Sequence, residues 1–171
     1  LNQRLAKEWG RVGASSEELK GEMEKTIALY EAAPKWAFSE QAGATHFKKL
    51  CAACHQPLDE KENLGPKLAG SGSKGVKYLV ENIIDPNAVI PNEYIASTID
   101  LRDGRVITGI IQRQDDQTLT VATANETLSV PRAEIEDLQR SQLSMMPEGL
   151  LAPLADQEYR DLIYYLGRPG Q

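Results

Sequence analysis

The two cysteines of the chain lie three positions apart and are followed at once by one of its two histidines, in the segment Cys51-Ala52-Ala53-Cys54-His55. Covalent attachment of a haem requires two thiols that reach the two vinyl groups along one porphyrin edge, and an imidazole over the iron. A single short turn can present both sulfurs and the imidazole in this order. The segment therefore predicts one covalently bound haem c, with His55 as the ligand on one face of the iron.

Two other kinds of site also use a pair of cysteines at this spacing. A redox-active dithiol is typical of a parallel-sheet context in which a strand precedes the motif. Here a helical pattern precedes the motif, and no alternating strand–helix pattern follows it. A zinc site needs two more ligands, and His46 with His55 would supply them only awkwardly from one helix. Both alternatives fit the surrounding sequence less well than haem attachment does.

The second axial ligand of the iron is expected to be a methionine thioether. Met145 and Met146 lie in an irregular stretch just before the last predicted helix, and Pro147 would stiffen that loop. We expect Met146 to be the ligand and Met145 to be the fallback, because only one of them can reach the iron along a given loop path. Both could instead be packing residues of the core. His46 is a rival ligand, but it precedes His55 on the same helical side of the haem.

Two further residues, Pro66 and Leu68, have expected places next to the haem. The carbonyl of Pro66 could accept the other ring N–H of His55 and so fix the orientation of the imidazole. An ordinary turn is the alternative role for Pro66. Leu68 could pack on the porphyrin face, whereas Met23 lies on an apolar helix face and is expected in the core.

Helical periodicity surrounds the motif on both sides. The first 35 residues predict a helical hairpin, the first helix of which carries Leu1, Leu5, Trp9 and Val12 on one face. Further helices are predicted from about Glu40 into Cys51, from Val76 to Ile84, and after Asp156 as an N-cap until Gly167. On the motif helix, Gly43 and Phe47 are expected to cross closely against Tyr164 or Tyr165 of the last helix.

At about Glu93 the periodicity changes from that of a helix to that of a strand. Four short strands are predicted, at Tyr94–Leu101, Val106–Gln112, Leu119–Thr123 and Leu128–Val130, with a hairpin turn at Asp103-Gly104. Pro131 to Leu138 is then predicted to return to helix or turn. The strands would form a meander or a small curled barrel. This β module could bind a partner through its edge strands, or it could be a structural lid over the haem.

The composition and net charge of the chain bear on whether it spans a membrane and on which partners it binds. The 171 residues are 41% hydrophobic, and no apolar run approaches the roughly 18 residues that a transmembrane helix requires. The chain does not start with a basic and then apolar signal segment. A net charge of −6 argues against nucleic acid as a partner, because its phosphates require a basic surface. It is compatible with a redox partner protein that carries a basic docking patch.

Together these segments resemble the mitochondrial-type cytochrome c fold. The resemblance is carried by Gly43-x-x-x-Phe47, the Cys51–His55 motif, Gly65-Pro66-x-Leu68-x-Gly70, the Met-Pro pair and the last helix. The chain is more closely similar to the c-type haem-binding domain of planctomycetes and verrucomicrobia. That similarity is carried by the segments Ile83–Pro86, Val89–Tyr94, Asp103–Gly109, Val130–Ile135 and Ser144–Leu150.

The resemblance implies a mainly α cytochrome c fold with an inserted small antiparallel β meander or barrel, so that the fold is α+β as a whole. It divides the chain into an N-terminal helical extension at 1–35, a haem domain at 36–92 and 141–171, and a β insertion at 93–140. It also implies Met146 as the axial ligand. Residues 1–35 are not matched to the family, and they could be either the end of a preceding region of a larger exported protein or a helical extension of this chain alone.

The expected function is that of a one-electron carrier and not of an enzyme, because His/Met ligation leaves no open coordination position on the iron. Haem catalysis of the peroxidase type, with a labile distal ligand, is one alternative. The electron-accepting domain of a larger dehydrogenase is another. Covalent haem attachment in this family also implies the periplasm or another exported space.

Overall fold

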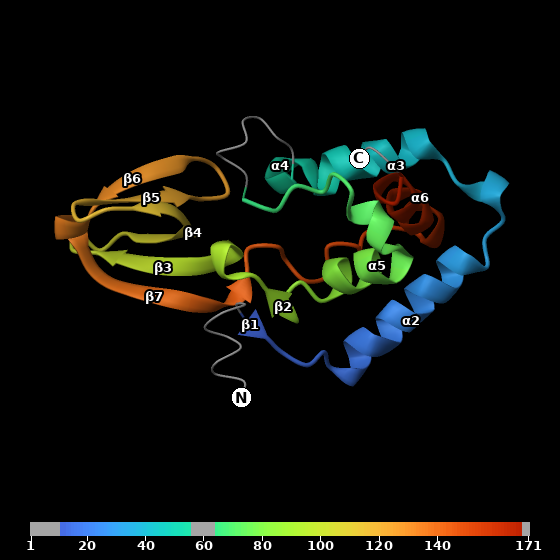
Figure 1. The fold of residues 1–171 in the computed structure, drawn as a ribbon, viewed down its shortest axis with the longest axis horizontal. Helices are drawn as coiled ribbons and strands as arrows, with labels where there is room; N and C mark the ends of the chain where they lie inside the picture. Colours follow the sequence, from blue (N-terminus) through green and yellow to red (C-terminus); the bar gives the residue numbers. More distant parts are fainter. Residues whose placement is uncertain (1–10, 56–63, 169–171) are drawn as a thin grey trace. The chain divides into compact units, whose positions relative to one another are not determined.

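The computed structural model describes residues 11–55 and 64–168, which belong to two compact units. The helical unit consists of residues 14–55, 67–88 and 147–168, and the β unit consists of residues 11–13, 64–66 and 89–146. In the described residues the chain forms five α-helices and one five-stranded antiparallel sheet (Figure 1). The α+β fold class predicted from the sequence is confirmed.

The helical unit is built on the crossing of two helices that lie far apart in the sequence. Its helices are α2 (Glu17–Glu31), α3 (Glu40–Leu50), α4 (Ala52–His55), α5 (Val76–Ile84) and α6 (Asp156–Leu166). Helix α3 packs mainly on α6, and α2 packs on α5 and α6 (Figure 1). The apolar stripes of these helices meet in one core, in which Val80, Leu162 and Ile163 are almost fully buried. Burial of each such side chain contributes about 1.5–3 kcal/mol.

Side-chain hydrogen bonds define where these helices begin. Ser39 precedes α3, and its Oγ accepts the N–H of Ala42 at 3.2 Å. Helix α6 starts at Asp156 itself and not one residue later, because the carboxylate of Glu158 accepts the N–H of Ala155 at 2.7 Å. Gly167 ends α6, as predicted. These contacts satisfy backbone donors that a helix leaves free at its start.

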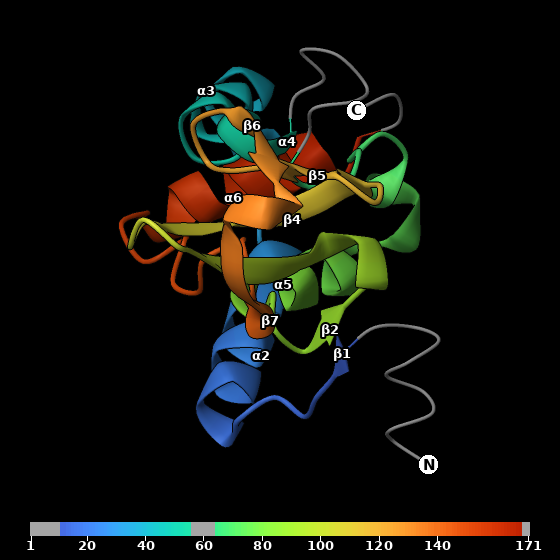
Figure 2. The same ribbon diagram turned by 90° about the vertical axis from the view of Figure 1, so that its left-hand side faces the viewer.

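The β unit is a curled antiparallel sheet with the strand order β6-β5-β4-β3-β7 (Figure 2). Its strands are β3 (Ile95–Leu101), β4 (Val106–Gln114), β5 (Thr118–Ala122), β6 (Thr127–Pro131) and β7 (Ile135–Ser144). Two more short strands, β1 (Arg11–Val12) and β2 (Val89–Ile90), form a separate antiparallel pair. Alternate side chains of the sheet enclose a second core of Ile99, Leu101, Leu119, Val121 and Val130. The four predicted strands are therefore confirmed.

Two segments differ from the sequence-based expectation. The first helix of the predicted hairpin falls mostly on residues 1–10, outside the described residues, and its last part is wrong, since Arg11–Val12 is a strand paired with Val89–Ile90. The return to helix or turn after Pro131 is confirmed only for the 3₁₀ turn Arg132–Glu134. The ten residues that follow form β7, which pairs with β3 over its length. The division of the chain into domains at residues 35, 92 and 140 stays a prediction.

Candidate functional site

The predicted haem-attachment motif forms one helical turn at the end of α3. The N–H of Cys51 donates to the carbonyl of Phe47 at 2.8 Å and closes α3. The carbonyl of Cys51 then accepts the N–H groups of Cys54 and His55, at 3.1 and 2.9 Å. Residues three positions apart on a helix lie on the same face. One turn therefore holds both thiols and the imidazole, which is the local geometry that the spacing predicts.

The two thiols differ in burial, and burial sets their chemistry. Cys51 is only 8% exposed and belongs to the core of the helical unit, whereas Cys54 is half-buried, and both are free thiols. Burial, and to a lesser extent Cys54, raises the pKa of the Cys51 thiol from 9.0 to about 11. Burial also raises the pKa of the Cys54 thiol. Both sulfurs are therefore protonated near neutral pH, whereas a redox-active dithiol has a thiol with a lowered pKa.

The surroundings of the motif are apolar. Cys51 shares its core with the buried side chains of Val80, Leu151 and Leu162, and Leu68 packs against the same cluster. Among the described residues no three His, Cys, Asp or Glu side chains are grouped so that they could hold a metal ion, which is what the zinc alternative requires. Two protonated thiols, one imidazole and an apolar setting fit a covalently attached haem.

The remaining predicted site residues lie on both units. Leu68 is in the helical unit, as are the three motif residues, whereas Pro66 and Met146 belong to the β unit. The N–H of Met146 donates to the Oγ of Ser144 at 3.1 Å, and both Met145 and Met146 are half-buried. The roles of Pro66, Leu68 and Met146 toward the haem stay predictions. Met23 is a buried core residue, as predicted.

His46, the rival ligand, lies at the contact between α3 and α6. Its Nε2 is 3.7 Å from Oε1 of Glu158, and its side chain is 16% exposed. Glu158 is the residue whose carboxylate also caps the start of α6. This contact places His46 beside the start of α6.

The close crossing predicted at Gly43 is confirmed. A Cβ on this residue would lie 2.1 Å from the carbonyl oxygen of Asp161, so only glycine fits. The rings of Phe47 and Tyr165 lie 5.5 Å apart beside this point, and Tyr164 stacks instead on Phe38. The crossing sets the direction in which α3 approaches the motif turn.

The carboxylate of Asp161 has a role in this crossing that was not predicted from the sequence. This side chain is 4% exposed, and its Oδ1 accepts the N–H of Ser39 at 2.7 Å and the Nε2 of Gln157 at 3.0 Å. A signal was present, because Asp161 precedes Leu162 and Ile163 on the buried side of α6. A charged residue at a core position indicates a specific hydrogen-bonding role. Here that role is to anchor the start of the helix that carries the motif.

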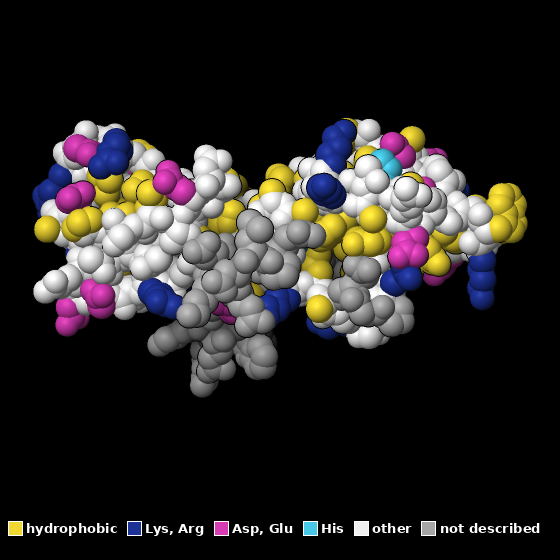
Figure 3. Space-filling view, turned by 90° about the horizontal axis from the view of Figure 1, so that it is seen from above, with side chains coloured by type: hydrophobic (Ala, Val, Ile, Leu, Met, Phe, Trp, Pro, Cys, Tyr) yellow, Lys and Arg dark blue, Asp and Glu magenta, His cyan; other side chains and the backbone are white. Residues whose placement is uncertain are grey.

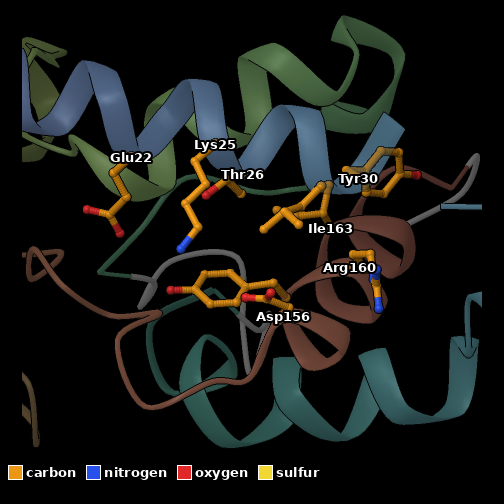
Figure 4. A pocket seen from close by; sticks show the side chains of 9 residues that line it. Glu22, Lys25, Thr26, Tyr30, Asp156, Arg160 and Ile163 are labelled. Atoms are coloured by element: carbon orange, nitrogen blue, oxygen red, sulfur yellow. The ribbon is translucent and has the colours of Figure 1, made fainter. Parts of the chain in front are cut away.

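A pocket of about 210 Å³ lies between α2 and α6, separate from the motif (Figure 4). It is lined by Glu22, Lys25, Thr26, Leu29, Tyr30, Asp156, Tyr159, Arg160 and Ile163. Burial raises the pKa of the Tyr159 hydroxyl, and the carboxylates of Glu22 and Asp156 add to the rise. The motif residues do not line this pocket, so its charged groups take no part in the candidate haem site.

None of the described helices has the length and apolar character needed to cross a bilayer. In the comparison with protein families, residues 40–98 match the family described as Cytochrome c. The matched segment contains α3, the motif turn and α5, and it ends within β3. The comparison with curated proteins finds no match.

Proposed function

We propose, taking the cytochrome c family domain at residues 40–98 as the premise, that this chain is a one-electron carrier with a single haem c. Cys51 and Cys54 would hold the haem through thioether bonds, and His55 and Met146 would be its axial ligands. A haem iron so ligated takes up or releases one electron without binding a substrate. A cytochrome c domain implies haem-based electron transfer and redox partner proteins.

The observation that carries this proposal is the single helical turn that presents Cys51, Cys54 and His55 together. Cys51 is fixed by its burial in the core, so it would anchor one edge of the porphyrin against the apolar cluster. Leu68, which packs on the same cluster, would pack on the porphyrin face. The Pro66 carbonyl would orient the imidazole of His55.

Met146 is the better of the two methionines as distal ligand, because Pro147 follows it directly and fixes the backbone there. His/Met ligation fills all six coordination positions and raises the reduction potential of the iron. This ligation favours an electron carrier over a peroxidase-type enzyme, which needs a vacant or labile position. It is also the ligation expected for the planctomycete and verrucomicrobial type of haem domain, to which we assign the chain.

The first test is to express the chain together with a c-type maturation system and to measure its mass under denaturing conditions. We expect one haem per chain, retained after denaturation, and loss of that covalent haem when both Cys51 and Cys54 are replaced by Ser. A protein that leaves maturation without covalent haem would contradict the proposal.

The second test concerns the distal ligand. Ferric haem ligated by a thioether has a weak charge-transfer band in the far red, which Met146→Ala should abolish and Met145→Ala should retain. The two substitutions are a matched pair, because the residues are adjacent and both are half-buried. Loss of the band in Met145→Ala alone would transfer the ligand role to Met145. A five-coordinate, high-spin spectrum of the resting protein would favour peroxidase-type chemistry instead.

Cytochromes of the c type are generally extracytoplasmic, and we propose the periplasm or another exported space for this chain.

The net charge of −6 favours a partner with a basic docking patch. Next to the motif the surface also carries positive charge, because Lys48 and Lys49 are exposed in the last turn of α3. On the face in Figure 3 acidic and basic side chains are interspersed. Faster electron transfer with a basic than with an acidic partner protein at low ionic strength would support the proposed patch.

A further inference from the structure

Two chain segments connect the helical unit with the sheet of the β unit. A hydrogen bond joins these segments where they leave the helical unit. The helical unit ends at Ala88 before the sheet and resumes at Pro147 after it. Asn87 and Glu148 lie next to these two junctions, within the helical unit. The side-chain amide Nδ2 of Asn87 donates a hydrogen bond to Oε1 of Glu148. The pair joins positions that are 61 residues apart in the chain.

On the first segment, Asn87 is held in place by a buried turn. Asp85 is 6% exposed, and its Oδ1 accepts the backbone N–H of Asn87 at 3.2 Å. The carbonyl of Asp85 also accepts the N–H of Ala88, at 3.2 Å. Pro86 lies inside this turn, and its ring fixes the backbone φ angle. The turn therefore fixes the backbone of Asn87 at the end of α5.

On the second segment, Glu148 is followed by a turn that enters the core. Gly149 has a φ of 68°, and its carbonyl accepts the N–H of Ala152 at 2.9 Å. Leu151 is 2% exposed and packs in the core that also contains Cys51. Asn87 thus fixes the start of a segment whose next few residues are already fixed by packing.

Met146 lies only two residues before Glu148 in the chain. Two residues span at most about 7 Å of extended backbone. Whatever holds Glu148 to the helical unit therefore limits how far Met146 can move from that unit. We propose that the Asn87–Glu148 hydrogen bond is a clamp that keeps Met146 within reach of the haem iron, so that Asn87 and Glu148 are positioning residues for the methionine ligand.

This inference rests on the proposed ligation by Met146. It adds that the Asn87–Glu148 hydrogen bond determines how strongly the Met146 thioether stays bound to the iron. Without the clamp, the Met146 segment has more conformational freedom, and the dissociated state of the thioether becomes more populated. An external ligand that competes with Met146 then binds more tightly. The hydrogen bond is partly exposed to solvent, so its loss should shift this equilibrium by roughly three- to tenfold.

The test uses the full chain with its haem and imidazole as the competing ligand. Asn87→Ala and Glu148→Ala should each weaken the thioether charge-transfer band and tighten imidazole binding to the ferric protein by roughly three- to tenfold. Glu148→Gln keeps an acceptor oxygen for the Asn87 amide and should behave as the wild type does. Asn82→Ala is the matched control, because within the described part of the chain the Asn82 amide bonds to the carbonyl of Tyr78 in its own helix and not to the second segment.

A double variant separates the clamp from general destabilisation. If Asn87 and Glu148 act through each other, the double substitution to Ala should affect imidazole binding no more than either single one. Single variants that lower the thermal midpoint but leave the band and the imidazole affinity unchanged would overturn the clamp while leaving Met146 ligation intact. Absence of the thioether band from the wild-type protein would overturn Met146 ligation and the clamp together.

Discussion

Gly43 and Asp161 are in backbone contact where α3 crosses α6: a methyl group on Gly43 would approach the carbonyl oxygen of Asp161 to 2.1 Å. The carboxylate of the same Asp161 accepts the N–H of Ser39 at 2.7 Å, at the start of α3. Helix α6 therefore fixes α3 at its start and in its first turns. Because α3 runs directly into Cys51, this double contact determines where the motif turn lies in the helical unit.

Gly43→Ala should destabilise the protein by about 1–3 kcal/mol, because the added methyl group overlaps backbone that cannot move without separating the two helices. The matched control is Gly21→Ala in α2, where nothing lies within 4 Å of the added Cβ. That control should stabilise the protein by about 0.5–1 kcal/mol, since alanine is the better helix former. Urea unfolding of the two variants would check this difference in sign. Equal effects would contradict the close crossing.

Asp161→Ala should cost about 1–3 kcal/mol, since it removes the part-buried hydrogen bond between the Asp161 carboxylate and the N–H of Ser39. Asp161→Asn retains an acceptor oxygen for Ser39 and should cost less. The free energy of unfolding from urea titrations gives this order. If the two variants were equally unstable, the charge of Asp161 and not its hydrogen bond to Ser39 would be the stabilising feature.

The elements around the motif were predictable because their signals are local. The helix that ends at the motif has its apolar residues at helical spacing, and Gly43 with Phe47 indicated a close crossing. The turn of Cys51, Cys54 and His55 follows from three residue types at a fixed spacing. The relation of Met146 to His55 is not local, because many residues separate them in the chain. It therefore stays a prediction for the spectroscopic tests to decide.

The strand β7 was not predictable from its own sequence. Ile135 and Leu138 are three positions apart, which is a helical spacing, and most of the strand is exposed. Its pairing with β3, for example Leu138 opposite Ile99, supplies the hydrogen bonds that make it a strand. Strand β1 is a similar case, since Arg11–Val12 is extended because it pairs with Val89–Ile90. Such long-range pairing leaves no periodic signal in a short segment.

The free energy of unfolding of the apoprotein should depend on pH through the Cys51 thiol, and covalent attachment of haem should remove this dependence. Burial raises the pKa of the Cys51 thiol from 9.0 to about 11. Between these values the unfolded chain loses the thiol proton while the folded protein keeps it, so the free energy of unfolding falls as the pH rises. A thioether carries no such proton, and the Cys51 contribution should vanish in the haem protein.

Urea unfolding of the apoprotein at several pH values between 9.0 and about 11 would measure this slope. Apoprotein with Cys51→Ala is the control, and it should show a shallower decline. Alkylation of the folded apoprotein should also modify the half-buried Cys54 faster than the buried Cys51. Equal rates for the two thiols in the folded state would contradict the burial of Cys51.

Separate hydrophobic cores predict that a core substitution loosens mainly its own unit. Leu119 and Leu162 are both 0% exposed, one in the core of the β unit and one in that of the helical unit. Replacing either by Ala should cost about 2–5 kcal/mol. Leu119→Ala should speed hydrogen exchange in β3 to β6 and leave α3 and α6 protected, and Leu162→Ala should do the reverse. Leu143→Ala, at a residue that is 60% exposed, is the control and should change little. If Leu119→Ala loosened α3 and α6 as much as the sheet, the two cores would be one cooperative unit, and the β unit would stabilise the helices that carry the motif.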